Sequence, residues 1–587
     1  MFKIFKSLKK KEWLLFAVGV VFVITQVYLD LKLPDYMSEI TRLVQTPGSK
    51  MSDIIHEGSW MLLCAFGSLA AAVISTGSAS RIATGMSARL RGQVFNQVQA
   101  FSMREINNFS TDSLITRCTN DITQIQTFIA MGLQLIIKSP VMAFWAIMKI
   151  RGKSWQWSVA TIVAVIILIV VISVCVSLVV PKFKRLQGFT DNLNRVTREN
   201  IVGIRVVRAY NAEEYQEKKF EGANSDLTRT SLFNNSVLSV MLPSITLIMN
   251  GLSLSIYWIG ASLIQAAGMQ DRITIFANMV VFSSYAMQVV ISFVMLVGVF
   301  MVGPRAIVSA RRVNEVIDTP LSLYDGDKEK SIVADEGNVE FKNVSFKYPD
   351  ASDYVIENIS FKANKGETIA IIGTTGCGKT TLINLIPRFF DATEGEVLVG
   401  GLDVKEYKQE SLRNMIGYVS QRAILFEGDI NSNIVFGKCQ KDKITHQEVL
   451  DAANIAQASE FIEKAEGGYN AHVSQGGTNF SGGQKQRLSI ARALARQPEI
   501  LIFDDSFSAL DYKTDRKVRS LLKEETLGTT MFIVAQRIGT IKDADKIIVL
   551  EDGKIAGMGT HDELINSCEV YQEIAYSQLS KEELANG

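Results

Sequence analysis

The sequence predicts a multi-domain protein in which an all-α membrane domain precedes an α/β domain. Three observations lead to this fold class. The chain has 587 residues, too many for one compact core. Long apolar stretches fill its first half. The second half has ordinary globular composition and holds a glycine-rich loop between a β-rich run and an apolar helical pattern.

Six stretches are long enough to cross a bilayer, which takes about 20 apolar residues. The N-terminus is basic and leads directly into the first stretch, with no small-residue cleavage site before it, so we expect an inside-facing anchor and no removed signal. The six predicted spans are 13–33, 60–80, 128–150, 157–180, 237–264 and 273–302.

Positive charges predict the orientation. Segments 81–126 and 181–236 carry many arginines and lysines, so we expect them, the N-terminus and the second half of the chain to be cytoplasmic in a multi-pass cell-membrane protein. The short link 149–153 is also basic although it faces outside in this topology. The positive charges of the other loops decide the predicted orientation. Four polar residues lie within the predicted spans, and we expect them either to line a translocation path or to form hydrogen bonds between helices. They are Asp30, Asn250, Asn278 and Gln288, with Asp30 expected near the outer end of its span.

Charge and cysteine content narrow the possible partners. Lys+Arg number 61 and Asp+Glu 60, for a net charge of +1, and no long basic run with interleaved aromatics appears. We therefore expect no nucleic-acid partner. The cysteines show no paired spacing and are expected to be free thiols in a reducing compartment. They are Cys64, Cys118, Cys175, Cys377, Cys439 and Cys568.

The glycine-rich loop has the pattern of a P-loop in its proper context of strand, loop and helix. Its glycines let backbone N–H groups surround phosphate oxygens, Lys379 can reach the β- and γ-phosphates, and Thr380 can offer its hydroxyl to Mg²⁺. The helix N-terminus adds to anion binding. The loop consists of Gly373, Thr374, Thr375, Gly376, Cys377, Gly378, Lys379, Thr380 and Thr381.

A second motif places a carboxylate at the same site. The run 500–504 reads as a strand buried on both faces, and it ends in Asp504 at the edge where α/β sheets bind ligands. We expect Asp504 to bind Mg²⁺ either directly or through water.

The run 480–487 resembles the signature motif of the ATP-binding cassette (ABC) family. By this resemblance, Tyr348 stacks on adenine, Gln421 touches Mg²⁺ and senses the membrane domain, and Asp511 lies in a loop that crosses between two cassettes. Short coupling helices are implied around 109–115 and 211–215. The signature residues are Ser481, Gly482, Gly483 and Gln484.

The resemblance covers essentially the whole chain and implies an exporter-type membrane domain of six helices followed by an α/β P-loop NTPase cassette. We expect the membrane domain with its cytoplasmic extensions over 1–318, a linker over 319–337, the cassette over 338–577 and a polar tail over 578–587.

Two positions depart from the family pattern. The family has a glutamate after the buried aspartate and a histidine after the last core strand, where this chain has Asp505 and Gln536. Aspartate is shorter by one methylene, and a displacement of about 1 Å can cost about 10²-fold in rate. Gln536 cannot be protonated. We therefore expect this chain's own site to hold ATP and Mg²⁺ but to hydrolyse ATP weakly or not at all.

Family cassettes dimerise head to tail, so an intact signature beside a poor base implies a heterodimer with a second half-transporter. The resemblance is to bacterial multidrug exporters, which implies a membrane-lipid environment and an amphipathic or hydrophobic small-molecule substrate. Four alternatives stay open: a lipid or peptide transporter, an importer with the exporter fold, a regulatory ATP-gated protein, and a slow symmetric homodimer in which Asp505 is a working base.

Overall fold

The computed structural model describes residues 8–46, 48–151, 154–268, 271–329, 337–349, 351–438 and 443–578. The chain forms two compact units, each treated separately below. Cys439, Lys153, residues 330–336 of the predicted linker and residues 579–587 of the predicted polar tail lie outside the described residues. The first unit comprises Met1–Gln99 and Thr111–Thr319, and the second comprises Ala100–Ser110 and Pro320–Gly587.

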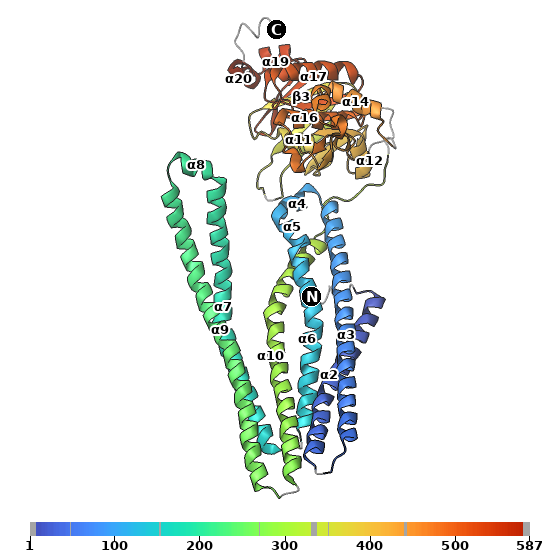
Figure 1. Cartoon of the computed structure of the whole chain (residues 1–587). Coiled ribbons are helices and arrows are strands. Elements are labelled where there is room, and N and C mark those ends of the chain that lie inside the picture. Colours follow the sequence, from blue (N-terminus) through green and yellow to red (C-terminus); the bar gives the residue numbers. More distant parts are fainter. Residues whose placement is uncertain are drawn as a thin grey trace. The chain divides into compact units, whose positions relative to one another are not determined.

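The first unit is entirely helical in its described part (Figure 1). Among the described residues, six helical segments are long and apolar enough to cross a membrane, which confirms the predicted number of spans. The helices extend well beyond the apolar stretches because polar residues continue each helical pattern past its span. They are α2 (Lys10–Gln45), α3 (Met51–Ala100), α5 (Thr111–Cys118), α6 (Asn120–Ile150), α7 (Trp155–Val202), α8 (Ile204–Ala209), α9 (Glu213–Ala266) and α10 (Asp271–Asp318).

A hydrophobic cluster joins α2, α6, α7, α9 and α10 within the membrane domain. Gly260 of α9 allows a close contact with α10, because a Cβ there would lie 2.2 Å from Sδ of Met279 and this side chain would have to shift. Small residues let helix backbones approach closely in this way. The indole N–H of the buried Trp157 donates to the carbonyl of Ile256 over 3.1 Å, so this polar group is satisfied inside the cluster.

Two ion pairs join membrane helices. Lys149 of the basic link donates to Asp35 over 2.6 Å, and the Tyr285 hydroxyl donates to the same carboxylate over 2.5 Å. The positive charge of Lys149 is therefore paired with a carboxylate on another helix, and the side of the membrane on which this link lies stays a prediction. Asp30 lies 3.5 Å from Lys138 and also accepts from Ser68, so it takes part in helix packing.

The helices α7 and α9 lie side by side and are joined by the short α8 (Figure 1). The short helix expected around 211–215 is misplaced in the sequence prediction: α8 covers Ile204–Ala209, whereas Asn211 takes a positive φ of 50° in the turn before α9. Gly203 separates α7 from α8, and this break was missed. The helix expected around 109–115 is also shifted, because α4 ends at Asn108 and α5 begins at Thr111.

The second unit contains a six-stranded sheet in the order β12-β11-β3-β10-β9-β6 and a four-stranded sheet in the order β2-β1-β4-β5. The pairs joining β11, β3, β10, β9 and β6 are parallel, and β12 is antiparallel to β11. A β7-β8 pair completes the strands. The strands are β1 (Val339–Phe346), β2 (Ile356–Ala363), β3 (Thr368–Gly373), β4 (Glu394–Val399), β5 (Leu402–Asp403), β6 (Ile416–Val419), β7 (Gly428–Asp429), β8 (His472–Val473), β9 (Ile500–Asp504), β10 (Thr530–Val534), β11 (Lys546–Glu551) and β12 (Lys554–Gly559).

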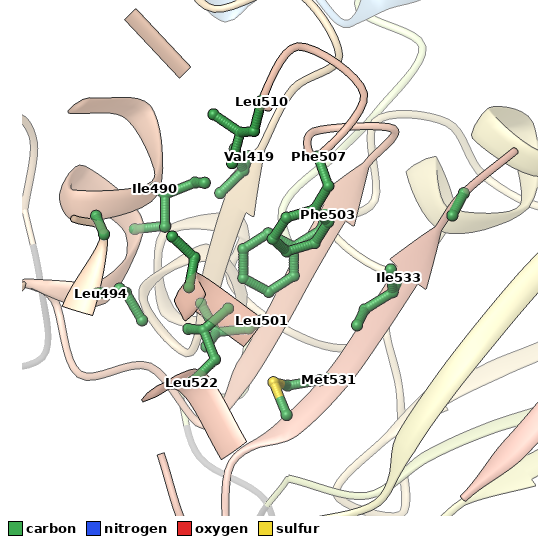
Figure 2. Close-up of a cluster of buried hydrophobic side chains, with 14 of the residues drawn as sticks. Val419, Ile490, Leu494, Leu501, Phe503, Phe507, Leu510, Leu522, Met531 and Ile533 are labelled. Atoms are coloured by element: carbon green, nitrogen blue, oxygen red, sulfur yellow. The ribbon is translucent and has the colours of Figure 1, made fainter. Parts of the chain in front are cut away.

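Helices cover the larger sheet. Leu501 and Phe503 of β9 enter one hydrophobic cluster while Ile500 and Ile502 enter another, which confirms that this strand is buried on both faces. Figure 2 shows the first cluster, where β9 and β10 meet side chains of α16 and α17. The helices are α4 (Met103–Asn108), α11 (Lys379–Asn384), α12 (Gln409–Asn414), α13 (Ile430–Ile434), α14 (His446–Ile455), α15 (Ser459–Lys464), α16 (Gly482–Leu494), α17 (Tyr512–Glu525), α18 (Ile538–Ile541), α19 (His561–Ser567) and α20 (Glu569–Gln578), with 3₁₀ turns at Gly468–Asn470 and Gln475–Gly477.

The segment around α4 and the start of the predicted linker belong to this second unit. The hydroxyls of Ser102 and Ser322 lie 2.9 Å apart, and the backbone N–H of Gly326 donates to the carbonyl of Tyr407 over 3.0 Å. A Cβ on Gly326 would lie 2.1 Å from the carbonyl oxygen of Glu406, so the backbone here approaches the cassette more closely than a side chain allows. Part of the linker is thus bound along the cassette edge.

Candidate nucleotide site

Four neighbouring parallel strands bring the predicted site residues to one edge of the sheet. The strand β3 runs into the P-loop, β6 ends two residues before Gln421, β9 ends at Asp504, and β10 ends two residues before Gln536. Because the carboxyl ends of parallel strands meet at one edge, residues far apart in the sequence come together there.

The P-loop wraps around the ammonium group of Lys379. Its Nζ donates to the carbonyls of Gly373 and Thr374 over 2.8 and 2.7 Å, and it lies 3.6 Å from Sγ of Cys377. Gly376 and Gly378 have φ of 91° and 95°, the left-handed region that favours glycine. Backbone N–H groups in such a turn can surround an anion at the start of α11.

Asp504 is buried and joined to the P-loop. Its Oδ1 accepts from the hydroxyl of Thr380 over 2.8 Å, and its Oδ2 accepts from the hydroxyl of Tyr418 over 3.4 Å. Burial raises the pKa of Asp504, and the negative charge of Asp505 adds to this, while the two hydroxyls and Lys379 act in the opposite direction. Burial also raises the pKa of Tyr418, so this phenol stays protonated and donates.

The oxygen atoms gathered here fit Mg²⁺. This ion prefers oxygen ligands and is commonly held by one or two carboxylates together with nucleotide phosphates. Thr380 and Asp504 present a hydroxyl and a carboxylate within one hydrogen bond of each other, and the Gln421 amide lies one strand away. These three residues are the ones that would hold the ion, which would neutralise phosphate charge.

Asp505 is held by two side-chain amides. Its Oδ2 accepts from Nε2 of Gln536 over 2.9 Å and from Nε2 of Gln421 over 3.2 Å. The residue is 9% exposed and adopts a positive φ of 46°, which is uncommon for a residue other than glycine. The two positions that depart from the family pattern therefore contact each other directly.

Tyr348 lies at the side of the P-loop helix. Its hydroxyl is 3.1 Å from Oγ1 of Thr381, and its ring makes edge-to-face contacts with Phe346 and Phe390 at centroid distances of 5.0 and 5.4 Å. These contacts fix the plane of the half-buried ring. An adenine platform at this position stays a prediction.

The signature residues form a separate feature at the N-terminus of α16. Ser481 and Gln484 make a reciprocal capping box: the Ser481 N–H donates to Oε1 of Gln484 over 2.9 Å, and the Gln484 N–H donates to Oγ of Ser481 over 3.3 Å. Ser481 and Gly482 are exposed. Within the described ranges no hydrogen bond joins these residues to the P-loop, and Asp511 instead caps α17 by accepting from the Thr514 N–H over 3.0 Å.

Sequence reasoning missed three residues that support this site. Tyr418 contacts Asp504 and also donates to Oδ1 of Asn384 over 3.0 Å. Gln578, at the end of α20, donates from Nε2 to the backbone carbonyl of Gln536 over 2.7 Å. A signal for Tyr418 was present in the sequence of β6, because its polar hydroxyl stands in an otherwise apolar strand. No comparable signal marked Asn384 or Gln578.

Both halves of the chain are similar to known proteins. Residues 356–508 match the model of the ABC transporter family, and residues 14–302 match that of the ABC transporter transmembrane region. An uncharacterized ABC transporter ATP-binding protein of Mycobacterium tuberculosis is 38% identical over 500 residues, covering 85% of each chain. The putative multidrug export ATP-binding/permease protein YgaD of Bacillus subtilis is 32% identical over 509 residues, covering 83% of this chain and 82% of YgaD.

A solved structure shares the fold. The structure of a bacterial Atm1-family ABC exporter with ATP bound superposes with a TM-score of 0.77 at 24% identity and covers 95% of this chain and 97% of its own. Fold and site together define a multi-pass membrane protein with an ATP-binding cassette. The chain belongs to the ABC transporter family.

Proposed function

We propose that this chain is one half of a heterodimeric ABC exporter, that its own P-loop site retains Mg²⁺ and ATP with little hydrolysis, and that its signature completes the partner's productive site. The transported compounds are amphipathic or hydrophobic small molecules. ATP-driven closure of the two cassettes opens the cavity outward, and hydrolysis at the partner's site resets it.

The observation that carries this proposal is the contact of Asp505 with Gln421 and Gln536. Hydrolysis needs a carboxylate placed to take a proton from the attacking water, and such assistance contributes about 10² to 10⁴-fold. Here the shorter carboxylate is tied to two neutral amides, neither of which can transfer a proton. Lys379, Thr380 and Asp504 remain arranged for binding, so retention of ATP is favoured over turnover.

The exposed signature supports the heterodimer. Ser481 and Gly482 lie at the open N-terminus of α16, where backbone N–H groups and the helix dipole favour a phosphate. A chain with a weak base benefits from an intact signature only if a partner presents a nucleotide to it. Similarity to YgaD, a putative multidrug export protein, supports drug-like compounds as the exported substrates.

The test is ATP hydrolysis by the full-length chain in nanodiscs, alone and co-purified from native membranes with its tagged partner, with and without Asp505→Glu plus Gln536→His. We expect the lone chain to be nearly inactive, the pair to be active, and the double substitution to raise activity of the lone chain by at least about 10-fold. Lys379→Ala in the doubly substituted chain is the matched control and should abolish the gain.

Equal rates for the lone chain and the pair would replace this proposal with the symmetric homodimer in which Asp505 is a competent base. Substrate direction is tested separately in inside-out vesicles, where an exporter accumulates a fluorescent amphiphile in the lumen on addition of ATP. Depletion from the lumen would favour the importer, and movement of labelled lipid alone would favour the flippase.

A further inference from the structure

The last residue of α20 is bonded to the loop that carries Gln536. The side-chain carbonyl of Gln578 accepts from the backbone N–H of Ile538 over 2.9 Å, and its amide N–H donates to the backbone carbonyl of Gln536 over 2.7 Å. One side chain therefore holds both backbone groups that flank Arg537.

These two hydrogen bonds give partners to two backbone groups, the N–H of Ile538 and the carbonyl of Gln536. Ile538 is the first residue of the short helix α18, whose first N–H groups have no partner inside the helix. The residue before it, Arg537, makes no side-chain cap. Gln578 supplies this missing acceptor from a part of the sequence about 40 residues further on, and its N–H group fixes the carbonyl of the residue that contacts Asp505.

The helix α20, which carries Gln578, is held in place by buried side chains. Tyr571 and Ala575 are fully buried in the same cluster that contains Ile538 and Ile541. The Tyr571 hydroxyl also lies 2.7 Å from Nδ1 of His561 on α19. About one more helical turn beyond Ala575 brings the chain to Gln578. This placement lets Gln578 form its two hydrogen bonds to the loop 535–538.

Further hydrogen bonds connect the loop held by Gln578 to the nucleotide site. Nε2 of Gln536 donates to Asp505, and the same carboxylate accepts from Gln421. A chain of hydrogen bonds thus runs from Gln578 through Gln536 to Asp505 and on to Gln421, and it joins the C-terminal helix to three loops at the ends of β10, β9 and β6.

We propose that Gln578 is a positioning residue for the ATP site: it holds the loop 535–538 so that the side chain at 536 stays on Asp505. The C-terminal helix is then part of the machinery that sets how long this site keeps its nucleotide. This inference deepens the proposed function, because it concerns the same site, but its first test does not depend on the degenerate chemistry.

The first test is amide hydrogen exchange of the full-length chain in nanodiscs, read on peptides that cover 535–541. In Gln578→Ala we expect exchange of these amides to be about 2- to 10-fold faster, the range given by loss of ordinary hydrogen bonds. Peptides of β9 and β10 should exchange as in the wild type. Glu573→Ala, which changes an exposed residue of the same helix, is the matched control and should alter neither region.

The second test separates the two bonds. In Gln578→Glu the carboxylate can still accept from the Ile538 N–H but cannot donate to the Gln536 carbonyl. We expect protection of Ile538 to be restored. In the background of Asp505→Glu plus Gln536→His, both Gln578→Ala and Gln578→Glu should lower kcat about 3- to 10-fold with KM for ATP unchanged, because the residue at 536 is displaced while the binding loop is intact.

The outcomes decide the two proposals separately. Unchanged exchange of 535–541 in Gln578→Ala overturns the positioning role, whatever the hydrolysis rates. Faster exchange spread over the whole cassette also overturns it, since Gln578 would then act on folding in general. If Asp505→Glu plus Gln536→His fails to raise hydrolysis, the proposed function fails, while locally faster exchange in Gln578→Ala still supports the positioning role.

Discussion

The amide of Gln536 donates a hydrogen bond to the carboxylate of Asp505 over 2.9 Å. The two residues are 31 positions apart in the sequence and follow adjacent strands, β9 and β10, so the contact is a consequence of the parallel sheet. Both are departures from the family pattern, and the direct bond makes them a coupled pair. Their substitutions should therefore not be additive.

This coupling can be measured with Gln536→Leu and Asp505→Asn. Loss of the amide leaves a nearly buried carboxylate short of a donor, and a hydrogen bond to a charged group contributes about 1.5 to 3 kcal/mol. We expect Gln536→Leu to lower the thermal unfolding midpoint of the full-length protein in detergent, and the combined variant to lose less than the sum of the two single variants. Strict additivity would show that the bond contributes nothing.

Two glycines of the P-loop should respond differently to alanine. At Gly378 a Cβ would lie 2.7 Å from Cγ2 of Ile356 and 2.9 Å from the carbonyl oxygen of Val355, whereas at Gly376 no atom lies within 4 Å. Both have left-handed φ, which costs about 1 to 2 kcal/mol for alanine. We expect Gly376→Ala to lower the free energy of unfolding by no more than this cost. We expect Gly378→Ala to be clearly less stable than Gly376→Ala and to lose ATP binding. Equal losses in thermal melts would contradict the clash.

Tyr418→Phe should weaken Mg²⁺-dependent nucleotide binding. The substitution keeps the ring against Phe389, at a centroid distance of 5.4 Å, but removes the hydroxyl that donates to Asp504 and Asn384. We expect the Mg²⁺ concentration for half-maximal ATP binding to rise about 3- to 10-fold. Binding of ATP in the presence of a chelator should not change, and an equal loss under both conditions would refute the role at the ion.

The matched control for this experiment is Tyr354→Phe. It also removes a phenol that donates to a carboxylate, with 2.7 Å between the hydroxyl of Tyr354 and Oε1 of Glu394. That pair is exposed, and its hydrogen bond involves none of the predicted site residues. We expect the control to bind ATP and Mg²⁺ as the wild type does.

Glu105 should make stability depend on pH. Burial alone would raise its pKa, but hydrogen bonds from Ser322 and Ser102 outweigh burial and hold the pKa below its usual value. A depressed pKa contributes stability above the ordinary value of 4.5, and this is lost as the pH falls through the lower folded pKa. We expect Glu105→Gln to melt earlier than the wild type at pH 7 and pH 5, and the difference to shrink below pH 4.5.

The control for the pH series is Glu214→Gln, which changes a glutamate whose side chain is 80% exposed and paired with Lys218 within α9. Its melting point should stay close to that of the wild type across the series, since exposed pairs contribute little. A pH-independent deficit in Glu105→Gln would mean that packing of the side chain, and not its charge, stabilises α4.

Much of the fold was predictable because its signals are local and strong. The apolar stretches gave the six spans, and the β-rich runs around 368–372 and 500–504 gave the two strands that hold the P-loop and Asp504. Lys379 and Asp504 could be named from the loop and the strand that carry them, whereas the roles of Gln421 and the other motif residues could be named only through the resemblance to the ABC family. The internal contacts of the site could not be predicted, because the bond between Gln536 and Asp505 depends on which strands are neighbours.

The errors came from features that leave little trace in a single sequence. The end of α7 depends on Gly203 and the start of α9 on the positive φ of Asn211, and such single-residue breaks are easily missed inside a long helical pattern. The ion pair of Lys149 with Asp35 was missed because the two residues lie on different helices, far apart in the sequence. Gln578 carried no motif at all, and only the packing of α20 brings it to the loop beside Gln536.

The contacts of Ser322 and Gly326 have a practical consequence for work on the soluble half alone. A fragment that begins at the predicted cassette boundary, Asn338, would lack both the strand-like contact of Lys328 with Tyr407 and the serine pair at Ser102. A fragment that begins at Pro320 would keep the first but still lose the second, because Ser102 precedes it by more than 200 residues. Activity and stability measured on an excised cassette would therefore describe a domain that lacks native contacts along one edge.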